Sequence, residues 1–99
     1  MKERIKVVRK RPGEAPELVE IDNTLEALQR EVGGYIETFT IASNATIICN
    51  EEGRLRGLPL NNTVLGPWAG TIMIVGVDGP EFTDTPEPEW VLQQFADRG

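Results

Sequence analysis

The side chains best suited to binding chemistry lie in one segment, residues 50–68. They are Asn50, Arg54, Arg56, Asn61, Asn62 and Trp68. Guanidinium groups hold phosphates, side-chain amides bind sugar hydroxyls or base edges, and an indole can stack on a base. The segment therefore predicts a site for a small, nucleotide-like anion, in which Arg54 and Arg56 hold the phosphates.

The same segment supports a second interpretation, in which it has a purely structural role. Leu55, Leu58 and Leu60 alternate with its polar residues. Leucines at this spacing can cover the edge of a hydrophobic core while the polar side chains face water. Residue types alone leave both interpretations open.

The usual catalytic groups are missing from the sequence. It has no histidine and one cysteine, which excludes Ser–His and Cys–His nucleophile activation and a thiolate zinc site. Cys49 follows two isoleucines, which is typical of a buried structural thiol. Glu51 and Glu52 are adjacent carboxylates before a glycine, a pattern more typical of a solvated turn. We therefore expect a protein that is not an enzyme.

A metal site is also not expected, and neither is a cofactor. Acidic residues recur at every third position in Asp78, Glu81, Asp84 and Glu87. Their spacing differs from that of a calcium-binding loop, and the proline at position 80 stiffens the segment. The sequence therefore offers no metal-ligating set.

Charge is distributed unevenly along the 99 residues, whose net charge is −6. Residues 1–11 carry six of the ten cations and one acid, a net +5, so residues 12–99 carry −11. A net-negative chain is repelled by DNA and RNA, so direct nucleic-acid binding is not expected. The basic segment is either a local anion patch or the neighbour of the acidic C-terminal third.

The compartment is predicted to be the cytoplasm. No apolar run approaches the roughly 20 residues of a membrane span, and the N-terminus has no apolar signal core. A single cysteine fits a reducing environment.

The elements that carry these residues are predicted to begin with a β-hairpin and a helix. Ile5–Val8 and Val19–Ile21 are strand-like runs around Pro12-Gly13, a pair suited to a type II turn. Asn23 and Glu26 form a capping pair for a helix of about nine residues. Gly33-Gly34 ends that helix, because glycine accepts the left-handed conformation.

The rest of the chain alternates strands and turns before a final helix. Strands are predicted at Tyr35–Ile41, Ala45–Cys49 and Thr71–Val77, the last buried on both faces, whereas residues 57–70 lack any period. Thr85-Pro86 predicts the start of the C-terminal helix. The fold class is therefore a single α+β domain over residues 1–99. It has a mainly antiparallel sheet of about five strands with two short helices on one face, in the order ββα, three or four strands, α.

Three stretches of the sequence resemble a known family. They are Ile21–Glu37, which contains the helix and Gly-Gly, Cys49–Asn61, which contains Asn-Glu-Glu-Gly, and Gly70–Gly76. Together they resemble domain of unknown function 3846, small proteins of phages, prophages and bacterial mobile elements. The resemblance brings no activity with it. It implies an accessory protein that acts in the cytosol of a bacterial host.

These observations lead to one main hypothesis and two alternatives. The main one is a homo-oligomeric binder that sequesters a small nucleotide-like anionic ligand, such as a nucleotide-type defence signal. The first alternative is an acidic interaction module or DNA mimic that inhibits a host protein, which the negative balance after residue 12 favours. The second is a domain with a structural role only.

Overall fold

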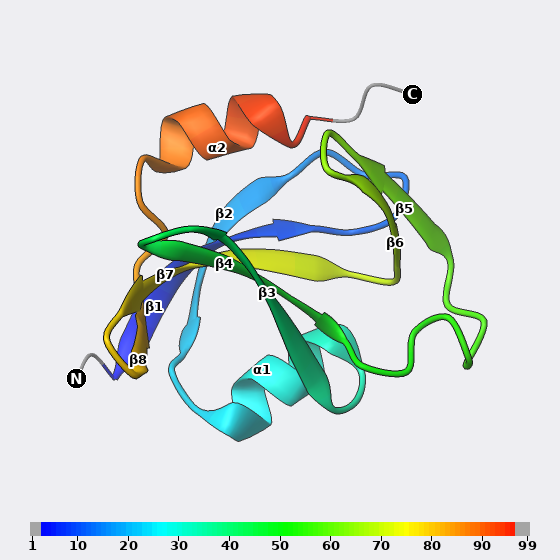
Figure 1. Ribbon diagram of the computed structural model, residues 1–99, viewed down its shortest axis with the longest axis horizontal. Coiled ribbons are helices and arrows are strands. Elements are labelled where there is room, and N and C mark those ends of the chain that lie inside the picture. Colours follow the sequence, from blue (N-terminus) through cyan, green and yellow to red (C-terminus); the bar gives the residue numbers. More distant parts are fainter. Residues whose placement is uncertain (1–2, 97–99) are drawn as a thin grey trace.

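The computed structural model describes residues 3–96 as one antiparallel sheet, a smaller two-stranded sheet and two helices (Figure 1). In chain order the elements are β1 (Arg4–Lys10), β2 (Glu17–Asp22), α1 (Leu25–Val32), β3 (Ile36–Ala42), β4 (Ala45–Asn50), β5 (Leu60–Thr63), β6 (Gly66–Ala69), β7 (Ile72–Asp78), β8 (Glu81–Thr83) and α2 (Pro88–Gln94). The predicted α+β class and element order are confirmed.

β1 and β2 form the predicted N-terminal hairpin. Pro12 and Gly13 occupy the centre of its turn, Gly13 has a φ of 73°, and the Glu14 N–H donates to the Arg11 carbonyl at 3.2 Å. A positive φ at the third position is what defines a type II turn, and glycine adopts it without a steric cost.

β1 lies beside the start of the C-terminal third, as one expectation had it, because the Lys6 N–H donates to the Asp84 carboxylate at 2.8 Å. The two arginines of β1 have other partners. The ion pairs join Arg4 to Glu20 and Asp22, and Arg9 to Glu17 and Glu31. The antiparallel register places Arg4 opposite Asp22 and Arg9 opposite Glu17. Carboxylates of β2 and α1 thus neutralise these arginines, so they do not form an open anion patch.

Helix α1 is present, but it begins one residue later than the sequence suggests. Thr24 is the N-cap, and its hydroxyl oxygen accepts the Ala27 N–H at 3.1 Å. Asn23 instead donates its side-chain N–H to the Phe82 carbonyl of β8 at 3.1 Å, a distant contact that removes it from capping. Gly33 ends the helix with a φ of 81°, as predicted.

The main sheet has the order β2-β1-β7-β4-β3. β8 lies outside this order and pairs with the end of β7, at Gly76–Asp78. Every pairing in it is antiparallel. β7 is central, and its residues Ile72–Val75 are fully buried, which confirms the prediction of a strand covered on both faces. β2 and β3 form the two outer edges.

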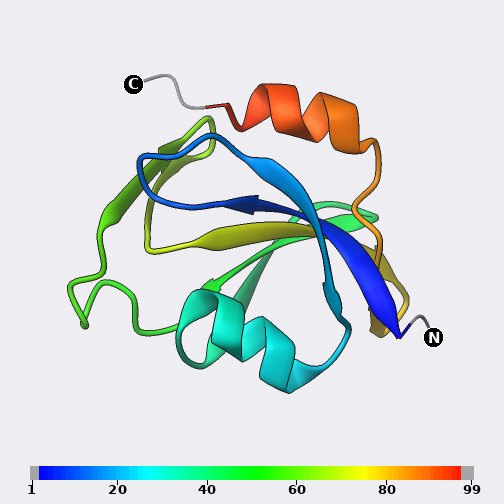
Figure 2. The ribbon, with the colours of Figure 1, turned by 180° about the vertical axis from the view of Figure 1, so that it is seen from behind.

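The two helices lie on opposite faces of the sheet, not on one face as predicted (Figures 1 and 2). Leu28 and Val32 of α1 pack with Met73 and Val75, whereas Val91 of α2 packs in the cluster that contains the alternate β7 residues. Side chains alternate between the faces of a strand, so a central strand that is apolar throughout needs cover on both sides.

Residues 57–70, predicted to be irregular, contain the β5–β6 hairpin. Thr63 lies opposite Gly66 in its register, and the Thr63 hydroxyl donates to the Gly66 carbonyl at 3.0 Å. The same hydroxyl oxygen accepts the indole N–H of Trp68 at 3.2 Å. These side-chain bonds stabilise a hairpin whose Asn, Pro and Gly residues have low strand propensity.

The C-terminal helix also begins later than predicted. The Thr85 N–H donates to the Lys6 carbonyl of β1 at 2.8 Å, so this residue continues the sheet contact and does not cap the helix. Glu87 is the N-cap residue, and Pro88 takes the first helical position. Within residues 3–96, neither helix is long and apolar enough to cross a membrane.

Candidate functional site

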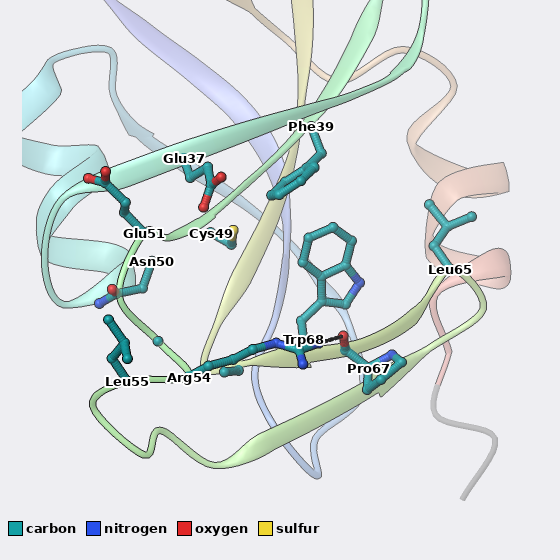
Figure 3. Close-up of a pocket in the computed structure, with 12 residues that line it drawn as sticks. Glu37, Phe39, Cys49, Asn50, Glu51, Arg54, Leu55, Leu65, Pro67 and Trp68 are labelled. Atoms are coloured by element: carbon teal, nitrogen blue, oxygen red, sulfur yellow. Dashed lines mark hydrogen bonds between the residues drawn. The ribbon is translucent and has the colours of Figure 1, made fainter.

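A cavity of about 320 Å³ opens between β3, the turn after β4, and β6 (Figure 3). The side chains that matter for binding are those of Glu37, Phe39, Cys49, Glu51, Arg54 and Trp68. The volume lies at the lower end of the range for small-molecule sites, about 300–1,000 Å³. This cavity is the candidate functional site.

The structure divides the six predicted site residues into two groups. Asn50, Arg54 and Trp68 line the cavity, whereas Arg56, Asn61 and Asn62 do not. Only half of the predicted site residues therefore lie at the cavity, and the six side chains have different roles.

Asn50 lines the cavity, but its amide already has partners. Its Nδ2 donates to the Val32 carbonyl at the end of α1 at 3.0 Å, and its Oδ1 accepts the Glu52 N–H at 2.8 Å. Only 6% of Asn50 is exposed. The residue therefore joins helix α1 to the turn after β4 and has little capacity left for a ligand.

The turn after β4 lies directly on β6. A Cβ atom added to Gly53 would be 2.6 Å from the carbonyl oxygen of Ala69. No side chain fits at that distance, so glycine is what allows the turn to approach β6. This contact fixes the floor of the cavity at the level of the backbone.

Asn61 of β5 is fully buried and is structural. Its Nδ2 donates to the carbonyls of Lys10 and Gly70 at 2.8 and 2.9 Å, and its Oδ1 accepts the Lys10 ammonium at 3.1 Å. Lys10 is itself 1% exposed and also donates to the Arg11 carbonyl. Asn61 thus supplies part of the hydrogen bonding that a buried ammonium group needs.

Arg56 and Asn62 lie outside the cavity for different reasons. Arg56 donates to the Gly33 carbonyl at 2.9 Å and so satisfies the C-terminal end of α1. It lines a separate hollow beside Tyr35 and Glu52. Asn62 is exposed on β5. Neither side chain belongs to the candidate site.

Arg54 and Trp68 are the other two predicted site residues that line the cavity. Arg54 is exposed and reaches the Pro67 carbonyl only at 3.5 Å, a distance at which a hydrogen bond contributes little. The rings of Trp68 and Phe39 meet edge to face, with centroids 5.1 Å apart. Together they give the cavity an aromatic wall beside a guanidinium group.

Glu37 and Phe39 were missed by the sequence analysis, although the pattern of their strand could have indicated them. Glu37, Phe39 and Ile41 alternate along β3, so they share the face of the sheet on which Trp68 packs. The sequence indicated Glu51 only as a neighbour of Glu52. The structure separates them, because Glu51 lines this cavity and Glu52 lines the hollow beside Arg56.

Cys49 lies at the back of the cavity as a buried free thiol. Burial, together with the nearby Glu37 carboxylate, raises the pKa of the Cys49 thiol to about 11. Both effects disfavour the thiolate. At neutral pH the group is therefore a protonated, weakly nucleophilic side chain.

The charges around the cavity differ from those expected for a purely anionic ligand. Glu37 and Glu51 lie on one side, and Arg54 lies near Trp68 on the other (Figure 3). Carboxylates accept hydrogen bonds and the guanidinium donates them, so the cavity suits a ligand that has donors at one end and an anionic group at the other. Within residues 3–96, no group of three or more acidic or cysteine side chains is placed to hold a metal ion.

Comparison with known families gives the class of the protein. Residues 5–97 match the domain of unknown function DUF3846, so the chain belongs to this family. Neither the curated proteins nor the solved structures contain a match to the chain.

Proposed function

We propose that this protein is a binding domain that holds a small nucleotide-like molecule in the cavity and leaves it chemically unchanged. The observation that carries the proposal is the grouping of an aromatic wall, one guanidinium and two carboxylates around about 320 Å³. Pockets of this size with few polar groups among apolar ones are typical of ligand sites.

The arrangement favours a base that has hydrogen-bond donors on its edge. In the proposed complex the base lies against Trp68 and Phe39, its imino and amino groups donate to Glu37 or Glu51, and its phosphate binds Arg54. Guanine carries these two donors side by side, whereas adenine has no imino donor there. Guanine nucleotides are therefore the first ligands to test.

The raised pKa of the Cys49 thiol supports a protein that binds a ligand without reacting with it. A thiol whose pKa is about 11 is a poor nucleophile at neutral pH, and the sequence has no histidine to activate it. Glu51 and Glu52, which the sequence suggested as a carboxylate pair, line different cavities. An acid–base pair built from these two residues would need a single site.

The biological setting we propose follows from the family resemblance and from the lack of a catalytic set. The protein would be a phage- or mobile-element accessory protein in the cytosol of a bacterial host. It would withdraw a nucleotide-type defence signal by binding it as a homo-oligomer. Sequestration needs affinity and abundance, and it needs no turnover.

Isothermal titration with guanosine monophosphate (GMP), guanosine, adenosine monophosphate, cyclic nucleotides and ADP-ribose tests the proposal. We expect GMP to bind more tightly than the adenine nucleotide. Arg54→Gln should weaken GMP binding at least about tenfold and leave guanosine binding unchanged, because only GMP carries the phosphate. Glu37→Gln should reduce the preference for GMP, since a carboxylate accepts from both guanine donors.

Asn62→Ala is the matched control, because Asn62 is an exposed polar residue of the same segment outside the cavity. It should bind GMP like the wild type. The absence of binding heat with every ligand at millimolar concentration would contradict the proposal. So would chromatography that shows steady conversion of a bound ligand.

The ion pairs of β1 favour one other function, docking of a host protein on an acidic surface. Because carboxylates neutralise Arg4 and Arg9, few cations offset the remaining acids on the surface. A pull-down from bacterial lysate separates the two functions. Sequestration predicts a co-purified metabolite, whereas docking predicts a host protein.

A further inference from the structure

One edge of the main sheet is exposed and nearly uncharged. In the described part of the chain, β3 pairs with β4 alone, and six of its seven residues are exposed. Glu37 is its one charged residue. Unpaired strand edges bind other strands unless lysine, proline, a bulge or a covering element prevents it. β3 has no lysine or proline, and its register shift between Thr40 and Ala42 leaves Ile36–Thr40 as a regular strand.

The other edge of the same sheet is protected in the usual way. β2 carries Glu17, Glu20 and Asp22, and each of these lies in an ion pair with an arginine. A second β2 strand brought alongside would place carboxylates near carboxylates, which is unfavourable. The contrast indicates that β3, and not β2, is the edge available for pairing.

Apolar side chains continue from the β3 edge over the surface next to it. Phe39 and Ile41 are 43% and 39% exposed. Ile41 also lines a second cavity of about 300 Å³, together with Leu65 and Trp90, which are 51% and 59% exposed. Large exposed apolar side chains grouped in this way mark interaction surfaces in soluble proteins.

We propose that a second copy of this chain pairs with β3 through its own β3, antiparallel, about a twofold axis at Phe39. This register places Thr38 opposite Thr40 of the second copy, a favourable cross-strand pair, and the two Phe39 rings beside each other. Glu37 lies near Ile41 of the second copy, the residue at which the regular register of β3 ends. The sheets of the two copies then form one continuous sheet, with both β2 edges at its outer ends.

The net charge of the chain restricts where a second copy can bind. Two copies of charge −6 repel each other overall, so the contact must lie where acidic residues are few. In the proposed register the two Glu37 residues are four positions apart along the strand, about 13 Å. That separation exceeds the screening length of about 8 Å at physiological ionic strength. The β3 edge therefore joins two acidic chains without opposing their carboxylates.

The pairing also bears on the candidate ligand site, although it does not rest on the proposed function. Glu37 and Phe39 line the ligand cavity, and Ile41 lines the apolar one. An antiparallel twofold brings Ile41 of the second copy beside Glu37, so each subunit adds an apolar wall to its neighbour's cavity. The two ligand cavities then lie close to each other on one face of the joined sheet.

Sedimentation equilibrium tests the pairing. We expect wild-type protein to have twice the chain mass of 11.0 kDa at about 100 µM. A variant with Thr38→Lys and Thr40→Lys, and another with Thr38→Glu and Thr40→Glu, should each be monomeric, because like charges then face each other. An equimolar mixture should recover the dimer, because the register places each lysine opposite a carboxylate.

Leu18→Lys on β2 is the matched control, since Leu18 is 42% exposed on the opposite edge and its change should leave the dimer intact. Circular dichroism checks that every variant is folded. A monomeric wild type, a charged variant that still dimerises alone, or a mixture that stays monomeric would overturn the proposal. Thr38 and Thr40 do not line the ligand cavity, so titration with GMP reports on the ligand proposal separately.

Discussion

Two residues of one segment, Arg54 and Asn61, show how differently similar binding chemistry can be used. Arg54 is exposed at the cavity, and its one contact is long. Asn61 is fully buried and has hydrogen bonds to Lys10 and Gly70. Side-chain type identifies what a residue can bind, whereas burial and existing partners decide whether it is available to a ligand.

The comparison of Arg54 with Asn61 predicts that the largest loss of stability follows a change of Asn61. Asn61→Leu removes an acceptor from the buried Lys10 ammonium and a donor from two carbonyls, so we expect a loss of about 3 kcal/mol in the free energy of unfolding. Urea denaturation measures it. Asn62→Leu, next to it and exposed, should change stability by less than about 0.5 kcal/mol. Equal losses in the free energy of unfolding for Asn61→Leu and Asn62→Leu would contradict the assignment of Asn61 as structural and Asn62 as available to a ligand.

Asn50 tests a residue that lines the cavity but is predicted to be structural. Asn50→Ala leaves the Val32 carbonyl and the Glu52 N–H without their partner, and we expect a loss of about 2 kcal/mol in the free energy of unfolding. Glu51→Ala, one residue away and exposed, should have a much smaller effect. If Asn50→Ala instead left stability unchanged and abolished ligand binding, Asn50 would belong with Arg54.

Cys49 combines features of the structural residues and of the residues available to a ligand, because it is buried and also lines the cavity. With a pKa of about 11 the folded thiol stays protonated up to high pH, whereas in the unfolded chain it ionises near its ordinary pKa of about 9. Alkylation by iodoacetamide at pH 8 should therefore be at least about tenfold slower in folded protein than in urea-unfolded protein.

The same shift fixes the sign of a stability change. Because the folded state keeps the proton longer, stability from this group is present below pH 9 and falls as the pH rises from 9 to about 11. A Cys49→Ala variant should lack this component of the pH dependence. Rapid alkylation of the folded wild type at pH 8 would contradict the assignment of a protonated thiol.

Features set by neighbouring residues could be predicted from the sequence. The type II turn at Pro12-Gly13 and the end of α1 at Gly33 depend on local backbone conformation, and both were correct. The central strand was also clear from its apolar run. Its burial on both faces implied cover on both sides, so the placement of both helices on one face was an avoidable error.

Features set by distant residues could not be predicted. Asn61 is structural because its partner Lys10 lies 51 positions away in the sequence. Asn23 does not cap α1 because it binds β8, and Thr85 does not cap α2 because it binds β1. The cavity itself depends on β3 lying over the turn after β4. No single segment carries the signal for such contacts.

The central position of β7 has a consequence for the order in which the molecule assembles. The β1–β2 and β3–β4 hairpins both pair with β7 and not with each other. During translation they emerge from the ribosome well before residues 72–78, with the apolar sides of β1 and β4 still open to water. Contacts between distant segments form late and slowly. The two hairpins therefore remain separate units until β7, the strand that joins them, is available. A chain that stalls before residue 72 would therefore be a substrate for chaperones and proteases.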